Sequence, residues 1–94
     1  MGSARRPQPE RLATKLLQIR KTLCLTQEQV ANLLKNVKSP PRPAHISRFE
    51  LGTREPSLLV LLAYARLAGI SIDFLVDDDL DLPHSLPVSN SKRR

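Results

Sequence analysis

Proline and glycine divide the middle of this chain into short segments, and this division limits the possible folds more than any other feature. Pro40, Pro41 and Pro43 fall within four residues, so no helix can continue through them. Gly52 and Gly69 each follow an apolar stretch, a common position for a glycine at the end of a helix. With two Phe, one Tyr, no Trp and few β-branched residues, the segments between these breaks favour helices over strands. The 94 residues therefore predict one compact all-α domain with a core of Leu, Ile, Val and Ala.

Apolar spacing and capping residues predict five helices between residues 10 and 76. A stripe at helical spacing runs through Leu12, Leu16, Ile19 and Leu23. Thr26 and, three residues later, Gln29 form a capping box that begins a second helix. Further helices are expected over residues 43–51, 58–68 and 71–76. The fourth segment is almost wholly apolar but shorter than the ~20 residues that span a membrane, so we expect a core helix buried on most sides.

The charge of the chain is segregated along its length. Residues 1–66 hold 12 Lys and Arg against 4 Asp and Glu, while residues 67–91 hold 5 Asp and no Lys or Arg. Lys92, Arg93 and Arg94 are basic again, and the net charge is +6. A basic half that contains the second and third predicted helices suits a polyanionic partner such as DNA. The alternative is a solvated basic surface without a partner.

Other chemistry is sparse. The single cysteine, Cys24, excludes an internal disulfide and fits a reducing compartment. His45 and His84 have no further ligands at metal-binding spacing, so we expect no metal and no cofactor. The chain shows no phosphate-binding loop and no nucleophile–base pair, which argues against an enzyme. The Arg- and Pro-rich start shows no apolar signal segment, so we expect a cytoplasmic protein with no membrane contact.

The two ends are expected to lie outside the folded domain. Residues 1–9 are interpreted as a flexible basic arm, and a solvated tail is the favoured interpretation. Alternatively, Arg5 and Arg6 could reach a DNA backbone or minor groove. Residues 10–76 form the domain, and residues 77–94 form an acidic and then basic tail that is largely disordered. Ile72, Phe74, Leu80 and Leu82 could supply a dimer interface or could simply complete the core.

Five segments occur in a characteristic order: residues 16–20 (LLQIR), 23–31 (LCLTQEQVA), 46–52 (ISRFELG), 56–58 (PSL) and 67–75 (LAGISIDFL). This ordered set resembles the lambda-repressor-like, Cro-type helix-turn-helix proteins of the XRE family. The resemblance implies a compact five-helix DNA-binding domain and a bacterial or phage transcriptional regulator associated with the nucleoid. It also implies binding to double-stranded DNA as a homodimer, with residues 43–51 in the major groove.

The resemblance and the chemistry of the side chains together suggest roles for individual residues. Gln27 matches the family position that binds a DNA phosphate, and Arg20 and Glu50 match a structural salt bridge. Arg48 could read guanine or contact a phosphate, whereas Pro43 and Ala44 could only touch thymine methyl groups. The predicted DNA-binding residues are Gln27, Lys38, Arg42, Pro43, Ala44, His45, Ser47, Arg48, Thr53 and Arg54.

Two departures from the family pattern affect this interpretation. Cys24 stands where the family usually has a turn glycine, so the joint between the first two helices is expected to be strained or to have a different shape. The span from Ala31 to Ile46 is longer than usual, which makes the alignment of residues 38–44 with a groove uncertain. The longer loop could add phosphate contacts through Lys35 and Lys38, or could contact a protein. A second hypothesis is therefore an antitoxin or adaptor that uses the fold and the acidic tail to bind a protein partner.

Overall fold

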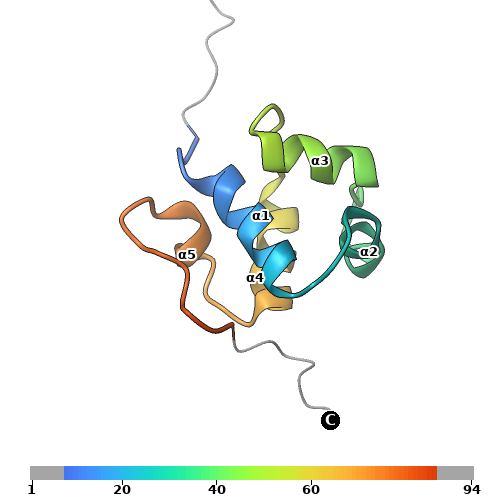
Figure 1. Ribbon diagram of the computed structural model, residues 1–94. Coiled ribbons are helices and arrows are strands. Elements are labelled where there is room, and N and C mark those ends of the chain that lie inside the picture. The colour runs from blue at the N-terminus through green and yellow to red at the C-terminus, as the bar shows by residue number, and fades with distance from the viewer. Residues whose placement is uncertain (1–7, 87–94) are drawn as a thin grey trace, which may run out of the picture.

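The computed structural model describes residues 8–86, and within this range it contains five helices and no strand (Figure 1). The helices are α1 (Leu12–Thr22), α2 (Gln27–Leu33), α3 (Pro43–Leu51), α4 (Leu58–Ala68) and α5 (Asp73–Val76). The all-α, five-helix prediction is confirmed. The expected arm with Arg5 and Arg6, and the last residues of the expected tail, 87–94, lie outside the described residues.

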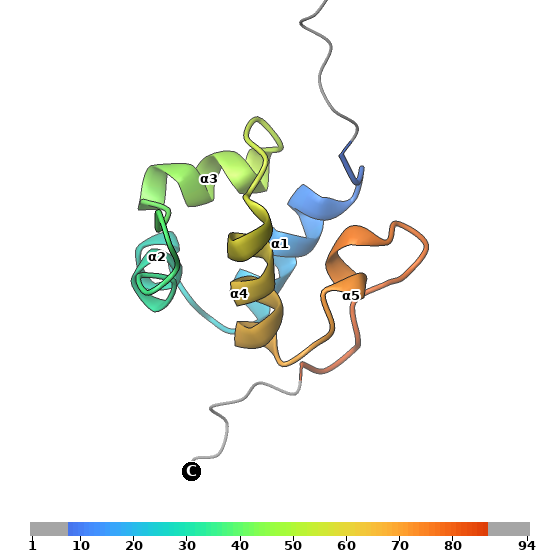
Figure 2. The same ribbon diagram turned by 180° about the vertical axis from the view of Figure 1, so that it is seen from behind.

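The core lies where α1 and α4 cross, with α3 over one end and α2 and α5 on opposite sides (Figures 1 and 2). Each helix contributes apolar side chains to one cluster because its apolar positions repeat with the helical period. The most deeply buried members are Leu16, Ile19, Val30, Ile46, Tyr64, Ala68 and Leu75. Leucine, isoleucine, valine and alanine make up most of this cluster, as the composition predicts.

Helices α1, α3 and α4 all end in the same backbone motif. In each, one residue adopts a left-handed conformation: Cys24 (φ 59°), Gly52 (φ 78°) and Gly69 (φ 73°). The N–H of that residue bonds to the carbonyl three positions back, and the next N–H bonds to the carbonyl five positions back. Cys24 therefore occupies a conformation that favours glycine, which agrees with the strain expected at this joint.

Helix α4 is less buried than its composition suggests. Val60, Tyr64 and Ala65 are buried, but Leu58 and Leu59 are 71% and 50% exposed. The expectation that α4 would be buried on most sides is thus wrong. The other four helices are short and cover only part of its surface. None of the helices within residues 8–86 is long and apolar enough to cross a membrane.

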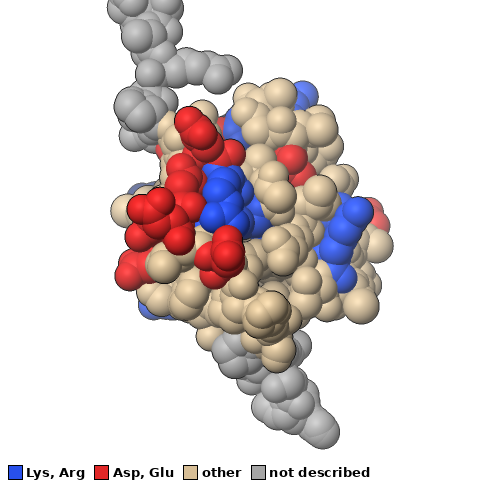
Figure 3. All heavy atoms as spheres, turned by 60° about the vertical axis from the view of Figure 1, so that its left-hand side comes forward, with Lys and Arg blue, Asp and Glu red and all other residues tan. Residues whose placement is uncertain are grey.

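Residues 77–86 pack against the start of α1, although the sequence analysis placed them in the tail. The Asp78 carboxylate accepts hydrogen bonds from the N–H groups of Glu10 (2.9 Å) and Arg11 (3.0 Å). These are N–H groups just before α1, where a carboxylate satisfies free donors and complements the helix dipole. The Arg11 guanidinium in turn bonds to the Asp78 carbonyl (2.7 Å) and to Asp81 (2.5 Å). Figure 3 shows this face, where acidic side chains gather around basic ones.

Further contacts extend the domain beyond the expected boundary at residue 76. The Lys15 ammonium, although buried, donates to the Asp77 carbonyl at 2.9 Å, and burial lowers the pKa of Lys15. Ile72, Leu82 and Leu86 pack against the core. For Ile72 and Leu82 the structure therefore favours the core role over a free dimer interface.

Candidate nucleic-acid interface

The start of α3 is held by a hydrogen bond from the residue before the helix to the His45 side chain. Arg42 precedes the helix, Pro43 is the first helical residue, and the Arg42 N–H donates to His45 Nδ1 at 3.1 Å. Since Nδ1 accepts this bond, the imidazole is neutral and its proton lies on Nε2. Partial burial, followed by the nearby charges of Arg54, Arg48 and Arg42, lowers the pKa of His45. His45 thus offers one hydrogen-bond donor at the N-terminal end of α3.

One face of α3 is anchored and the opposite face is free. Ile46 and Phe49 are buried in the core. Pro43, Ala44 and Arg48 are exposed. Nothing else in the described chain covers this outer face of α3, so Arg48 is available to a partner.

Basic side chains lie around the exposed face of α3. Lys38 and Arg42 come from the loop before the helix, Arg48 from the helix, and Arg54 from the loop after it. All four are exposed, and none forms an ion pair within the described residues. The fold therefore gathers the cations that the sequence analysis selected, and their charge suits phosphate groups.

Two of the predicted residues lie together although nine positions separate them. A hollow of about 370 Å³ between the loops on either side of α3 is lined by both His45 and Arg54.

The two predicted hydroxyl residues differ in their surroundings. Ser47 is half-buried. Thr53 donates from its hydroxyl to the Arg48 carbonyl at 3.4 Å and from its N–H to the same carbonyl at 3.0 Å. Thr53 thus helps to end α3, a role the sequence analysis did not foresee.

Glu50 is the carboxylate that joins three helices. Arg20 on α1 donates from Nε to Glu50 Oε2 (2.6 Å) and from a terminal nitrogen to Oε1 (3.0 Å). Its other terminal nitrogen donates to the Leu25 carbonyl at 3.0 Å. The side chains of Arg20 and Glu50 are only 16% and 5% exposed, so water screens their attraction weakly. The bond to Glu50 is the main reason that the pKa of Arg20 is raised.

Gln27 is attached to the same carboxylate. Its side-chain amide donates to Glu50 Oε1 at 3.0 Å, and the residue is half-buried at the start of α2. One amide hydrogen and the free backbone N–H groups of the first turn of α2 remain available to a phosphate. The capping box predicted at Thr26 is present, with reciprocal bonds to Gln29 of 3.0 and 2.8 Å. The start of α2 is therefore rigidly placed relative to α3.

This arrangement of α2 and α3 on a five-helix core can be compared with known proteins. A family model described as a helix-turn-helix matches residues 16–75. The chain belongs to the lambda-repressor-like, XRE-type helix-turn-helix family. The match runs from the first half of α1 to α5 and so includes the helix pair and the residues around Glu50.

The helix-turn-helix fold also resembles a solved structure. It is the crystal structure of the P22 c2 repressor protein in complex with synthetic operator 9T in the presence of Tl+. The TM-score is 0.62 and the identity is 23%, over 78% of this chain and 100% of that one. A comparison with curated protein sequences gave no match.

The long turn of this helix-turn-helix is packed rather than loose. Leu34 and Pro41 are buried, and Val37 between them packs against the core. Ser39 turns the chain with a left-handed φ of 55°. Because three apolar side chains attach the turn to the domain, the position of α3 is fixed despite the extra length.

Tyr64 on α4 is a part of the site that the sequence analysis missed. It is fully buried, and its hydroxyl has no hydrogen-bond partner within residues 8–86. Burial, and then the nearby Glu50 carboxylate, raises the pKa of Tyr64, so the hydroxyl stays protonated. Tyr64 lies close enough to the Arg20–Glu50 pair for both charges to act on its hydroxyl. The sequence signal that could have revealed this role is a single polar aromatic residue within an otherwise apolar helix.

Within residues 8–86, no three His, Cys, Asp or Glu side chains come together to hold a metal ion.

Proposed function

We propose that this protein is a transcriptional regulator that binds double-stranded DNA with α3 in the major groove. One observation carries the proposal: α3 is anchored by Ile46 and Phe49 and tied to α1 and α2 through Glu50, while its outer face is exposed and basic. A rigid helix that exposes cations is suited to a groove lined by phosphates. The operator-bound state of the structurally similar P22 c2 repressor is consistent with this proposal.

The side chains around α3 divide into two groups by chemistry. Lys38, Arg42 and Arg54, with the start of α2 at Gln27, would contact phosphates and position the helix. Arg48 would make paired hydrogen bonds to guanine, a contact worth about 1–3 kcal/mol of discrimination between bases. The remaining contacts to bases would come from Pro43, Ala44, His45 and Ser47, with His45 acting only as a donor through Nε2.

We further propose that the protein binds as a homodimer. Two copies related by a twofold axis would place their α3 helices about 34 Å apart, one turn of DNA. Leu51 ends α3 and Leu58 begins α4, and these two leucines are 72% and 71% exposed on either side of one loop. They supply an apolar contact surface beside α3. Such a regulator would work in the cytoplasm of a bacterium, on the nucleoid or on phage DNA.

The decisive experiment is selection of bound sequences from random duplex DNA, followed by a salt titration of the selected site. We expect a palindromic site and a steep fall of affinity with salt. Arg48→Ala should weaken binding to the selected site by roughly tenfold to a hundredfold if Arg48 reads a base, and should change binding to random DNA much less. Lys21→Ala, which removes an exposed cation at the far end of α1, is the matched control and should leave the preference unchanged. Binding that shows neither sequence preference nor salt dependence would refute the proposal.

The antitoxin or adaptor hypothesis receives less support from the structure. It assigns protein binding to the acidic tail, but Asp78 and Asp81 are already bonded to Glu10 and Arg11 of the same chain. A protein partner would have to replace these bonds. Retention of full cellular function in Arg48→Ala would nevertheless favour that hypothesis.

A further inference from the structure

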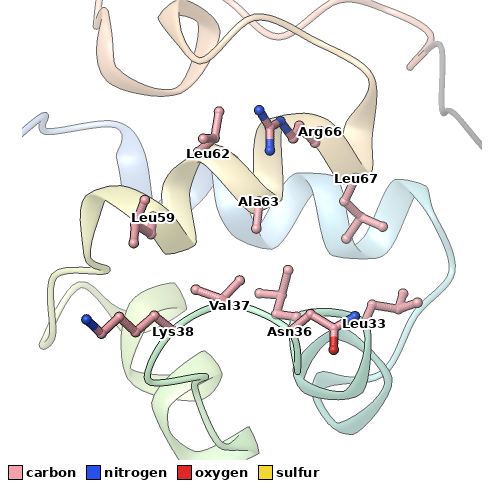
Figure 4. A pocket seen from close by; sticks show the side chains of 10 residues that line it. Leu33, Asn36, Val37, Lys38, Leu59, Leu62, Ala63, Arg66 and Leu67 are labelled. Carbon is pink, nitrogen blue, oxygen red and sulfur yellow. The ribbon is translucent and has the colours of Figure 1, made fainter.

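An apolar groove of about 510 Å³ lies between α4 and the long turn that precedes α3 (Figure 4). Leu59, Ala63 and Leu67 follow one another at intervals of four residues along α4 and point toward the turn. Leu33 and Val37 face them from the other wall. Because Ala63 is the smallest of the three residues on α4, the wall is recessed at its centre.

The groove presents apolar surface that the domain does not cover. Leu33 and Leu59 line the groove, and each is 50% exposed. The stretch of α4 from Leu59 to Leu67 is ~12 Å long, so about two turns of a second helix could lie along it. Binding of an amphipathic helix in an apolar groove uses this kind of surface.

The charged residues of the groove are all of one sign. Lys38 extends from the turn, and Arg66 also lines the groove, with its side chain on the side of α4 away from the turn (Figure 4). No Asp or Glu lines the groove, and neither cation forms an ion pair within the described part of the chain. An occupant that is apolar on one side and acidic along its edges would complement both features.

The 94 residues of this sequence do not include such an occupant. Residues 1–7 contain Arg5 and Arg6 and residues 87–94 contain Lys92–Arg94, without any acidic residue. The acidic segment of residues 77–81 is already bonded at α1. Two copies packed groove to groove would bring like charges together. Charge complementarity therefore favours a different, acidic chain.

We propose that this groove, formed by Leu33, Val37, Leu59, Ala63 and Leu67 with Lys38 and Arg66 at its margins, binds an acidic amphipathic helix of a partner protein. The anchors of that helix are leucine-sized side chains along one face, and Asp or Glu residues flank them. The site shares Lys38 with the proposed DNA-binding surface, but its apolar lining comes from α2, α4 and the turn, so the proposal does not depend on DNA binding.

The proposal is tested with two synthetic helical peptides and the 94-residue chain. Both peptides carry leucines at positions i, i+3, i+4 and i+7, and the other positions are Glu in the first peptide and Lys in the second. Titrations followed by amide NMR and by fluorescence anisotropy should show at least tenfold tighter binding of the Glu peptide. The NMR shifts should concentrate at residues 33–38 and 59–67.

Three variants make the test specific. The double variant Lys38→Glu/Arg66→Glu should reverse the preference between the peptides. Ala63→Leu, which fills the recess, should weaken binding of the Glu peptide at least tenfold. Lys21→Glu, a charge change outside the groove, should leave the preference as it is. Thermal unfolding verifies that each variant is folded, and binding of Ala63→Leu to the selected DNA should be unchanged.

Four results would overturn the proposal. The first is equal affinity for the two peptides, or no binding of either peptide. The second is a set of NMR shifts centred outside the groove. The third is self-association of the wild type, measured by sedimentation, that Ala63→Leu abolishes, because the occupant is then a second copy. The fourth is saturation of the groove by laurate without binding of the Glu peptide, because the site then serves a small amphiphile.

Discussion

Replacing Glu50 by glutamine would show how much its charge contributes to the placement of the helix pair. The substitution keeps the size of the side chain but leaves the Arg20 guanidinium, only 16% exposed, without its counter-ion. Removing one partner of a buried ion pair costs about 3–5 kcal/mol, and the residual exposure of Arg20 places the expected loss near the lower end, at about 3 kcal/mol. For a domain of this size, 1 kcal/mol corresponds to ~4–8 °C, so Tm should fall by ~12–24 °C.

Thermal and urea unfolding, followed by circular dichroism, measure this loss. Glu28→Gln is the matched control, because Glu28 is an exposed acid in the first turn of α2, and it should cost no more than about 1 kcal/mol. Replacing Arg20 and Glu50 together by methionine should recover much of the loss, since no charge is then stranded. A cost below about 1 kcal/mol for Glu50→Gln would refute the reasoning, because the pair would then behave like an exposed one.

Three other substitutions or titrations follow from the local geometry. Cys24→Gly should raise the free energy of unfolding by about 0.5–1 kcal/mol in urea denaturation, because glycine adopts the left-handed conformation without strain. Cys24→Ala should leave it nearly unchanged, and equal effects of the two would exclude the backbone explanation. Asp78→Asn should flatten the acid limb of the curve of stability against pH, because backbone hydrogen bonds lower the pKa of Asp78. The stability that the ionised Asp78 contributes to the wild type is present above about pH 4, and it is lost as the pH falls through the lowered pKa. Parallel loss of Tm in both proteins between about pH 6 and pH 3 would contradict this. His45 should titrate below its ordinary pKa of 6.5 and carry its proton on Nε2 at neutral pH, as nitrogen NMR shifts can show; a proton on Nδ1 would rule out its bond to Arg42.

The helices could be predicted from the sequence because short-range signals determine them. The capping box at Thr26 and the prolines around residue 41 act within four residues of the backbone that they affect. Gly52 and Gly69 end α3 and α4 for the same local reason. Each of these features could therefore be derived without knowledge of the tertiary structure.

The contacts that organise the site could not be derived in this way. Arg20 and Glu50 are 30 residues apart, and only the family resemblance suggested that they pair. The bond from Gln27 to Glu50 spans 23 residues and was not foreseen. Asp78 lies 68 residues from Glu10, so its sequence position gave no indication that it would cap the start of α1. Long-range pairing of polar side chains depends on how the helices pack, which local patterns do not encode.

The long turn before α3 was expected to affect the groove alignment of residues 38–44, and that of Arg48 less. Its packing shows a further consequence. Leu34, Val37 and Pro41 attach the turn to the core, so its extra length does not loosen α3. Residues of the turn, with the end of α2, instead form a wall opposite α4. Apolar composition alone could not show this, because it does not reveal whether α4 is covered by a neighbour or borders an open groove. The departure from the family pattern thus leaves the presentation of Arg48 intact and adds a second surface to the domain.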